Sequence, residues 1–131
     1  MSVPANFFTT TTVTASPADS TETVIATLSG LTELLPGLDV KLIAQCNITT
    51  QAATTAVVLK LRRTGVSGTQ VGTTCTHTIP GGAAAVSMLC TAWATDNLGT
   101  FSGEVYVLTA TCTSAAGAST VNTVRLEARV D

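Results

Sequence analysis

The sequence predicts an all-β protein, an antiparallel β-sandwich of about eight strands with a jelly-roll-like arrangement. Apolar and polar residues alternate with period two along most of the 131 residues, which is typical of strands with one buried face. Clusters of Gly, Pro, Asp and Ser interrupt this alternation about every 10 to 16 residues, as turns between short strands do. No segment has a convincing helical pattern. An immunoglobulin-like sandwich is the alternative, although the single Trp93 lacks the cysteine and tyrosine spacing of that fold.

The composition also favours strands. Charged residues make up 11% of the chain, well below the roughly 25% of typical soluble domains, whereas hydrophobic residues make up 45%. Threonine and alanine fill the difference. Threonine is β-branched, and its hydroxyl keeps an outward face hydrated without charge. A surface with so few charges suits secreted or assembled proteins, including those that pack against copies of themselves.

Charge and hydropathy exclude two classes of partner. The net charge is −2, and Arg62 and Arg63 are the only adjacent pair among six basic residues, so no basic stripe can offset nucleic-acid phosphates. The apolar runs are too short to span a bilayer, and the N-terminal MSVPANFF lacks the features of a signal peptide. We therefore expect a product made in the cytoplasm that has neither a nucleic-acid nor a membrane partner.

The chain divides into residues 1–20, an N-terminal arm with a short strand at about 7–14, and residues 21–131, a single β-sandwich domain. Phe7 and Phe8 are adjacent, so in a strand they face opposite sides. One of the two side chains can pack in the core, whereas the other must be covered by a different apolar surface. Either a neighbouring subunit supplies that cover, or the strand caps its own sandwich.

Residues 39–64 contain the clearest alternation, and we interpret them as two long strands joined by a polar turn, a β-hairpin. Its inward face carries Leu42, Cys46, Leu59 and Leu61. Its outward face carries half of the basic residues, and this makes it a candidate contact surface toward an acidic partner; these residues are Lys41, Lys60 and Arg62.

Five more strands complete the predicted set, at residues 22–29, 69–79, 83–94, 103–113 and 119–130. In the first of them Val24, Ala26 and Leu28 share one face. Gly72 interrupts the segment 69–79, which places that strand near a sheet edge. The Ala-rich segment 83–94 could also be a helix, but the flanking glycines and its Thr and Ser content favour a strand. Pro36 and Gly37 predict a turn in the loop 31–38, whose leucines form a lid or an exposed contact.

No motif for catalysis or metal binding is present. His77 is the single histidine and has no nucleophile motif beside it, and the carboxylates are scattered. Asp96-Asn97 could contribute to a calcium site but is typical of a turn, and the sequon at Asn47 lies inside a predicted strand. We therefore expect no enzyme activity and no cofactor.

The four cysteines form no CxxC or Cys/His cluster, which argues against a zinc site. Cys46 and Cys112 lie on predicted core faces, where they are either buried free thiols or, in an oxidising compartment, disulfides. The pair Arg62-Arg63 points to opposite faces of its strand. We interpret these arginines as solvated, the alternative being that one pairs with a carboxylate or a neighbouring chain.

Three segments, TETVIATLSG, NITTQAATTAVVLKLRRTG and GEVYVLTATCT, resemble small all-β virion proteins of tailed bacteriophages. The resemblance covers most of residues 20–130 and implies a decoration protein or head-fibre module, a trimer of jelly-roll or tumour-necrosis-factor-like sandwiches on the capsid lattice. It implies no catalytic residues. The four cysteines depart from the pattern.

The sequence thus leads to a capsid decoration protein, a homotrimer that binds the major capsid protein lattice on the virion surface. A receptor- or glycan-binding fibre module is the alternative, with Trp93, Phe101 and Tyr106 as its aromatics. A small hydrolase or, if a leader has been removed, a secreted adhesion domain is less well supported. The loops around Pro36 and Gly99 are docking elements, and the predicted contact residues are Val3, Pro4, Phe7, Phe8, Pro36, Lys41, Lys60, Arg62 and Arg63.

Overall fold

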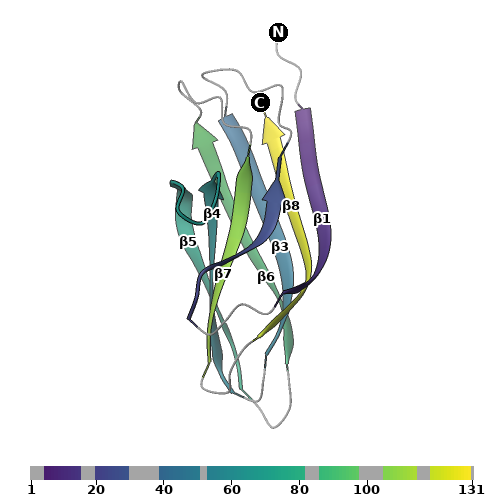
Figure 1. Cartoon of the computed structure of the whole chain (residues 1–131), viewed down its shortest axis with the longest axis vertical. Coiled ribbons are helices and arrows are strands. Elements are labelled where there is room, and N and C mark those ends of the chain that lie inside the picture. Colours follow the sequence, from purple (N-terminus) through teal and green to yellow (C-terminus); the bar gives the residue numbers. More distant parts are fainter. Residues whose placement is uncertain are drawn as a thin grey trace.

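A computed structural model describes residues 5–15, 20–29, 39–50, 53–81, 86–97, 105–114 and 119–130, with the backbone alone for 5–15 and for Val130. Figure 1 shows its eight strands. Their bounds are β1 (Ala5–Ala15), β2 (Thr23–Leu28), β3 (Asp39–Thr49), β4 (Thr55–Arg63), β5 (Gln70–Ile79), β6 (Ser87–Asn97), β7 (Tyr106–Ser114) and β8 (Thr120–Val130).

The strands form two four-stranded antiparallel sheets, ordered β1-β8-β3-β6 and β2-β7-β4-β5. Four of the pairings nest inside one another: β4 with β5, β3 with β6, β2 with β7 and β1 with β8. The chain is therefore one long hairpin, doubled back between β4 and β5 and then rolled up. This is the jelly-roll arrangement, so the predicted fold is confirmed in preference to the immunoglobulin-like alternative.

The predicted hairpin of β3 and β4 is wrong. β3 lies between β8 and β6 in one sheet, whereas β4 lies between β7 and β5 in the other. The intervening residues carry the chain across the sandwich, and the Thr50 N–H donates to the Val86 carbonyl oxygen on the way. A short polar segment can close a hairpin or cross between sheets, and local sequence does not distinguish the two. The hairpin at the centre of the roll is instead β4–β5, whose turn contains Gly65 and Gly68.

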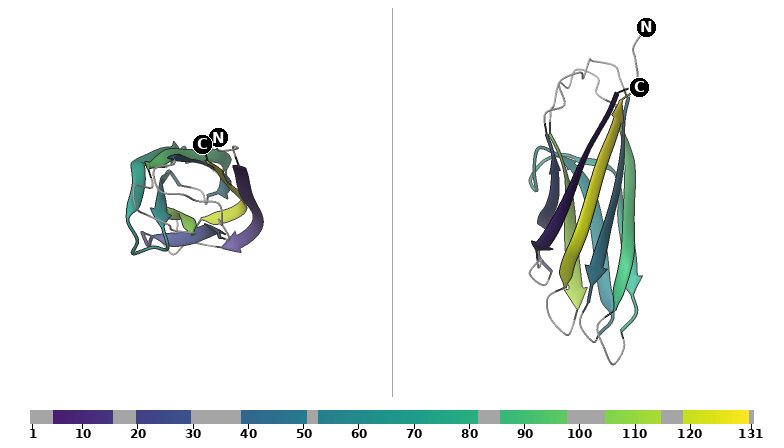
Figure 2. Two further views of the ribbon diagram at one scale, coloured as in Figure 1. Left: turned by 90° about the horizontal axis from the view of Figure 1, so that it is seen from above. Right: turned by 90° about the vertical axis from the view of Figure 1, so that its right-hand side faces the viewer.

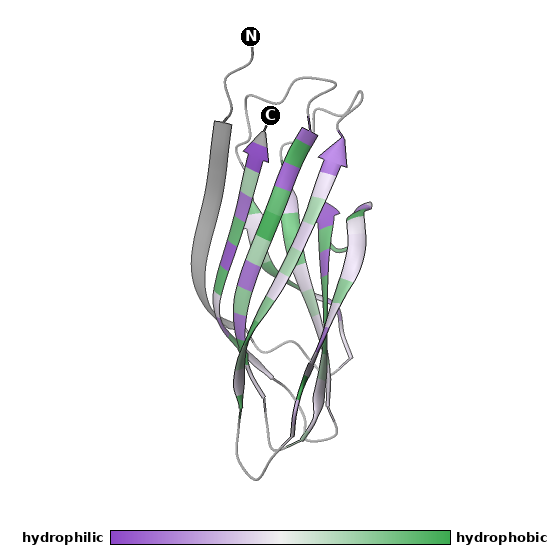
Figure 3. Ribbon diagram, turned by 180° about the vertical axis from the view of Figure 1, so that it is seen from behind, coloured by the Kyte–Doolittle hydropathy of each residue, from purple (hydrophilic) through white to green (hydrophobic). Residues whose placement is uncertain are grey.

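The inner faces of both sheets build the core. Along β3 and β4, and along β8 from Val124 to Ala128, every second side chain is buried, as the alternation predicts. Figure 3 shows the stripes along β8 and β3. Seen along the strands, the sheets wrap around this core, with β5 beside β6 and β1 beside β2 (Figure 2). The largest fully buried side chains include Leu42, Ile48, Leu59, Tyr106, Leu108 and Leu126.

Three of the four cysteines are buried in this core, and all four are free thiols. Cys46 and Cys90 are register partners across β3 and β6, and Cys112 lies on β7 of the facing sheet. Burial raises the pKa of Cys46 to about 12 and that of Cys90 to about 11, because a thiolate would lose its hydration there. The thiols therefore pack as small apolar groups, which confirms the first of the two alternatives for Cys46 and Cys112.

The strands β2 and β5 each contain a departure from simple alternation or regular pairing. In β2 a register shift between Val24 and Ala26 buries Ile25 and Ala26 together and leaves Val24 37% exposed. The prediction that Val24 shares one face with Ala26 and Leu28 is therefore wrong. β5 is an edge strand, as predicted, and Gly72 adopts φ +69° beside a register shift. A Cβ at Gly72 would lie 2.6 Å from the Cβ of Ala94, so the closeness of β5 to β6 also requires glycine.

The structure also tests the predictions for the N-terminal segment, for the Ala-rich segment and for the loops. β1 pairs with β8 from Ala5 to Ala15, so this segment is the edge strand of its own sheet. β6 is a strand and not a helix, and it extends to Asn97. The predicted lid at 31–38 and the loop around Gly99 lie outside the described residues. Within the described part of the chain, no helix is long and apolar enough to cross a bilayer.

Candidate binding face

The predicted contact residues do not form a single surface. Lys41 lies on the outer face of the β1-β8-β3-β6 sheet, whereas Lys60 and Arg62 lie on the outer face of the other sheet. The basic surface expected from a β3–β4 hairpin is therefore wrong. Val3, Pro4 and Pro36 lie outside the described residues, as do the side chains of Phe7 and Phe8, whose backbones are in register with Ala128 and Glu127.

Arg62 is engaged within its own sheet. Its guanidinium donates to Glu22 from Nε at 2.6 Å and from Nη2 at 3.0 Å, and the Thr109 hydroxyl donates to the same carboxylate at 2.8 Å. Lys60 Nζ lies 3.8 Å from this carboxylate. The hydrogen bond from Arg62 lowers the pKa of Glu22, although partial burial opposes the shift. The network therefore tethers the segment before β2 to β4.

Arg63 points the other way and joins the two sheets. Its Nε donates to Asp96 Oδ2 at 2.8 Å and its Nη2 to Oδ1 at 2.5 Å, and the Tyr106 hydroxyl donates to Oδ2 at 2.8 Å. Asp96 is only 7% exposed. The prediction that this arginine pair is solvated is therefore wrong, because each arginine forms an ion pair with a carboxylate. Asp96 and Asn97 lie at the end of β6, so the turn predicted for them is wrong.

The single histidine of the chain, His77, lies between two edge strands. His77 Nε2 lies 2.8 Å from the Thr91 carbonyl oxygen, so the ring links the edge strands β5 and β6. Among the described residues, no group of three or more His, Cys, Asp or Glu side chains could hold a metal ion.

The outer face of β8, β3 and β6 exposes large apolar side chains. Ile43 of β3 is the register partner of Trp93 of β6, and they are 52% and 71% exposed. Leu89, four residues before Trp93 on the same face, is 58% exposed. Clustered apolar side chains on a regular sheet are typical of an interaction surface. We call these three residues the apolar row.

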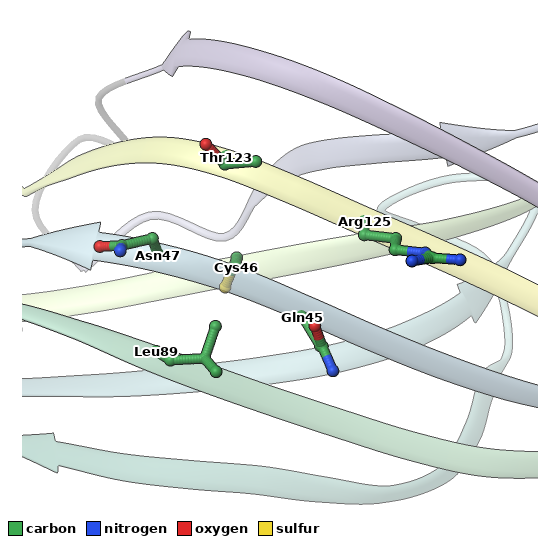
Figure 4. Close-up of a pocket in the computed structure, with 6 residues that line it drawn as sticks. All are labelled: Gln45, Cys46, Asn47, Leu89, Thr123 and Arg125. Atoms are coloured by element: carbon green, nitrogen blue, oxygen red, sulfur yellow. The ribbon is translucent and has the colours of Figure 1, made fainter.

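Polar residues lie in register beside the apolar row. Gln45 of β3 pairs with Thr91 of β6 and with Arg125 of β8. At the next level Asn47 pairs with Leu89 and with Thr123. A depression of about 230 Å³ lies among these side chains, on the outside of the sheet (Figure 4). Its lining residues are Gln45, Cys46, Asn47, Leu89, Thr123 and Arg125.

One polar atom at this depression lacks a partner. Asn47 Oδ1 is buried and accepts no hydrogen bond from any described residue. Arg125, at the other end, is 53% exposed in its side chain, and its Nη2 lies 3.5 Å from Glu127 Oε2. Figure 4 shows Leu89 of β6 pointing toward β3, on the opposite side of β3 from Arg125 of β8. The depression therefore combines an unsatisfied acceptor, a cation and an apolar wall.

Sequence reasoning missed this face, although part of its signal was present. Leu89 and Trp93 occupy the phase of β6 opposite to Cys90 and Ala92, so their outward position follows from alternation. Ile43 likewise stands in the outward phase of β3. Their clustering depends on the β3–β6 pairing, which lies between strands about 40 residues apart in the chain and which the alternation does not specify.

No family model matches the sequence, and neither does any curated protein. Solved structures share its fold. The structure of infectious bursal disease virus, Gx strain, superposes with a TM-score of 0.60 at 10% identity over 97% of this chain and 33% of that one. The VP2 subviral particle of the same virus gives 0.60 at 10% identity over 95% of this chain and 32% of that one.

Dimeric latent PorU from Porphyromonas gingivalis gives a TM-score of 0.61 at 8% identity over 98% of this chain and 13% of that one. This chain thus spans about a third of the viral chains and a smaller share of PorU. At these identities the likeness is one of fold, and this fold occurs in proteins of different function.

Proposed function

We propose that this chain is a structural virion protein, a capsid decoration protein that binds the outer surface of a phage head. The apolar row carries the proposal. Ile43, Leu89 and Trp93 are more than half exposed on a sheet whose inner face is firmly packed. Such a rigid platform with exposed apolar side chains suits a permanent contact with another protein.

The fold is consistent with this role. VP2 of infectious bursal disease virus, solved as a subviral particle, has the same kind of sandwich. A jelly roll presents broad sheet faces while most of its backbone hydrogen bonds stay internal, so it tolerates close packing in a shell. The phage-like segments noted in the sequence support a head protein, seated on the major capsid protein lattice and made in the host cytoplasm.

We further propose that the protein is a homotrimer with no enzymatic role. Copies around a symmetry axis would cover part of the sparsely charged surface that the composition predicts. Sedimentation of the purified chain provides the test of this point. A trimer mass supports the assignment, and a strictly monomeric chain at micromolar concentration contradicts it.

Binding to purified heads that lack the protein tests the decoration role. We expect the double variant Ile43→Ser/Trp93→Ser to bind at least about tenfold more weakly, since these side chains would lose their apolar contact. The matched control is Val66→Ser, which removes an exposed apolar side chain from the β4–β5 turn. Unchanged occupancy of the heads by the double variant would overturn the assignment of this face.

A receptor- or glycan-binding module is the second candidate, and the 71% exposure of Trp93 favours it. An open indole face can stack on a sugar ring, and Thr91 and Gln45 offer hydrogen-bonding groups nearby. Of the other aromatics proposed for this role, Tyr106 is fully buried and Phe101 lies outside the described residues. A glycan array should show a ligand whose binding disappears in Trp93→Ala, and an array without any ligand removes this candidate.

A further inference from the structure

We propose that, before the chain binds a head, its apolar row is covered by the same row of a second copy. The inference rests on the proposed function, because it names a competitor for the surface that binds the head. The two copies are related by a two-fold axis that runs parallel to the strands, between β3 and β6. Self-pairing and head binding therefore exclude each other.

The apolar contact lies at the centre of the face. Ile43 is near the middle of β3 and its register partner Trp93 is near the middle of β6. Their side chains are 52% and 71% exposed. Sheets that pack face to face lie about 10 Å apart, and because each sheet is twisted they touch best at the middle. An exposed aromatic and an exposed aliphatic side chain therefore stand where a second sheet would approach most closely.

The register makes this face complementary to itself. A two-fold axis between β3 and β6 places each β3 over β6 of the second copy and keeps residues at the same level along the strands. Trp93 of each copy then meets Ile43 of the other, so one axis produces the apolar contact twice. Contacts that occur in such reciprocal pairs are the property of an isologous interface.

The charges of the overlapping strands permit this pairing. The outward residues of β3 and β6 include one acid and one base, Asp39 and Lys41, so they have no net charge. Their register partners on β6 are the neutral Asn97 and Thr95. The axis therefore sets each charged residue opposite a neutral one, and no like charges meet. The charged residues of β8 lie on the other side of β3 from β6, outside the overlap; they are Arg125, Glu127 and Arg129.

The remaining levels are polar or only partly matched. Gln45 is set opposite Thr91 of the second copy, and each of these side chains carries both donors and acceptors. Leu89 is set opposite Asn47, a polar residue, so it gains little from the pairing. The self-pairing therefore depends on Ile43 and Trp93, whereas head binding can use all three residues of the apolar row.

The area sets the strength of the contact. Two strands of 11 residues, at about 3.3 Å per residue and about 4.8 Å apart, present about 36 Å by 10 Å, or about 350 Å² per copy. Stable interfaces bury about 800 Å² per partner, and smaller ones are weak or transient. The pairing is therefore reversible, as a cover that the head displaces has to be.

The pairing doubles the number of copies in the free protein. Two of the proposed trimers that share their three-fold axis would form a hexamer with D₃ symmetry, with their head-binding faces toward each other. A monomeric chain would form a dimer. Sedimentation from low to high micromolar concentration should therefore show the mass doubling, whatever the smaller species is.

Two charge variants test the arrangement. Ile43→Glu and Trp93→Lys each place a charge against an apolar side chain of the second copy, so each variant alone should keep the unpaired mass. In a mixture of the two variants, the axis sets Glu against Lys at one contact and leaves Trp93 against Ile43 at the other. The variants should then associate with each other at least about tenfold more strongly than either does with itself.

The matched control is Leu89→Ser, which removes another exposed apolar side chain of the same face and should change self-pairing less than about twofold. An equal loss of pairing in Leu89→Ser would mean that copies associate without a defined register. That result would overturn the proposal. So would a mixture of the two charge variants that associates no better than either variant, or a parent chain whose mass never doubles.

Adding purified heads separates this inference from the proposed function. As the head sites fill, the amount of paired chain should fall with them, and heads that bind the paired form intact would overturn the competition. A parent chain that binds heads but never pairs removes this inference and leaves the proposed function standing. A chain that pairs but does not bind heads removes the proposed function and leaves the self-pairing of the apolar row.

Discussion

Arg63 of β4 and Asp96 of β6 form a bidentate ion pair that links one sheet of the sandwich to the other. The Tyr106 hydroxyl completes the cluster by donating to Asp96 at 2.8 Å. A carboxylate that is 7% exposed has lost most of its water, so these three donors replace its hydration. The cluster closes the end of the core where β4 and β6 finish.

Asp96→Asn should lower the free energy of unfolding by about 2 kcal/mol, because it leaves the Arg63 charge without its counter-ion in a partly buried site. Urea unfolding measures the change. Glu127→Gln is the control, since it breaks the exposed pair with Arg125 and should cost less than about 0.5 kcal/mol. If the two variants lost equal stability, the cluster would have no special role in joining the sheets.

Gly72→Ala should destabilise the protein by about 2 kcal/mol, because alanine disfavours φ +69° and its Cβ would collide with Ala94. Gly65→Ala is the matched control, because a Cβ there would meet no atom within 4 Å. Adding Ala94→Gly to Gly72→Ala should restore the part of the lost stability that is due to the collision. No recovery in thermal unfolding would assign the whole effect to backbone strain.

Stability should fall as the pH rises above about 9. The pKa values of Cys46 and Cys90 are raised from 9.0 to about 12 and about 11 by burial, and burial also raises the pKa of Tyr106. The native state keeps protons that the unfolded chain releases between pH 9 and about 12 for Cys46, between pH 9 and about 11 for Cys90, and above pH 10 for Tyr106. Within its own window each group lowers the unfolding free energy by about 1.4 kcal/mol per pH unit.

The slope with pH, rather than the absolute stability, identifies these groups. Cys46→Ala removes one of them and should make the alkaline decline shallower, even though the smaller side chain lowers stability at neutral pH. Denaturant midpoints measured from pH 8 to 11.5 give both the slope of stability with pH and the stability at the low end of this range. A variant slope equal to that of the parent chain would mean that the Cys46 thiol does not contribute.

Deleting residues 1–15 should lower the melting temperature and cause aggregation, because the loss of β1 exposes the edge of β8. This differs from a detachable arm, whose removal would abolish head binding and leave the sandwich intact. Deleting residues 1–4 keeps β1 and serves as the control. If the longer deletion yields a monodisperse protein of parent stability, β1 is dispensable for the fold.

Much of the fold could be predicted because period-two alternation is a local signal. It located the strands and identified the buried faces of β3, β4, β6 and β8. It failed in β2, where the bulge at Ile25 changes the phase, since a bulge depends on the partner strand β7. The ion pairs of Arg62 and Arg63 were missed for the same kind of reason, because Glu22 and Asp96 are about 40 and 33 residues away in the chain.

The sequence by itself determined an all-β sandwich, its strands and the thiols in its core, because alternation and β-branching act within a few residues. Only the tertiary structure decided that β3 and β4 belong to different sheets and that β3 pairs with β6 and β8. Those pairings separate Lys41 from Lys60 and Arg62, and they bring Ile43 to Trp93 and Asn47 near Arg125. The physical reason is that strand pairing is a long-range choice among strands of similar pattern, settled by how all eight strands close around one core.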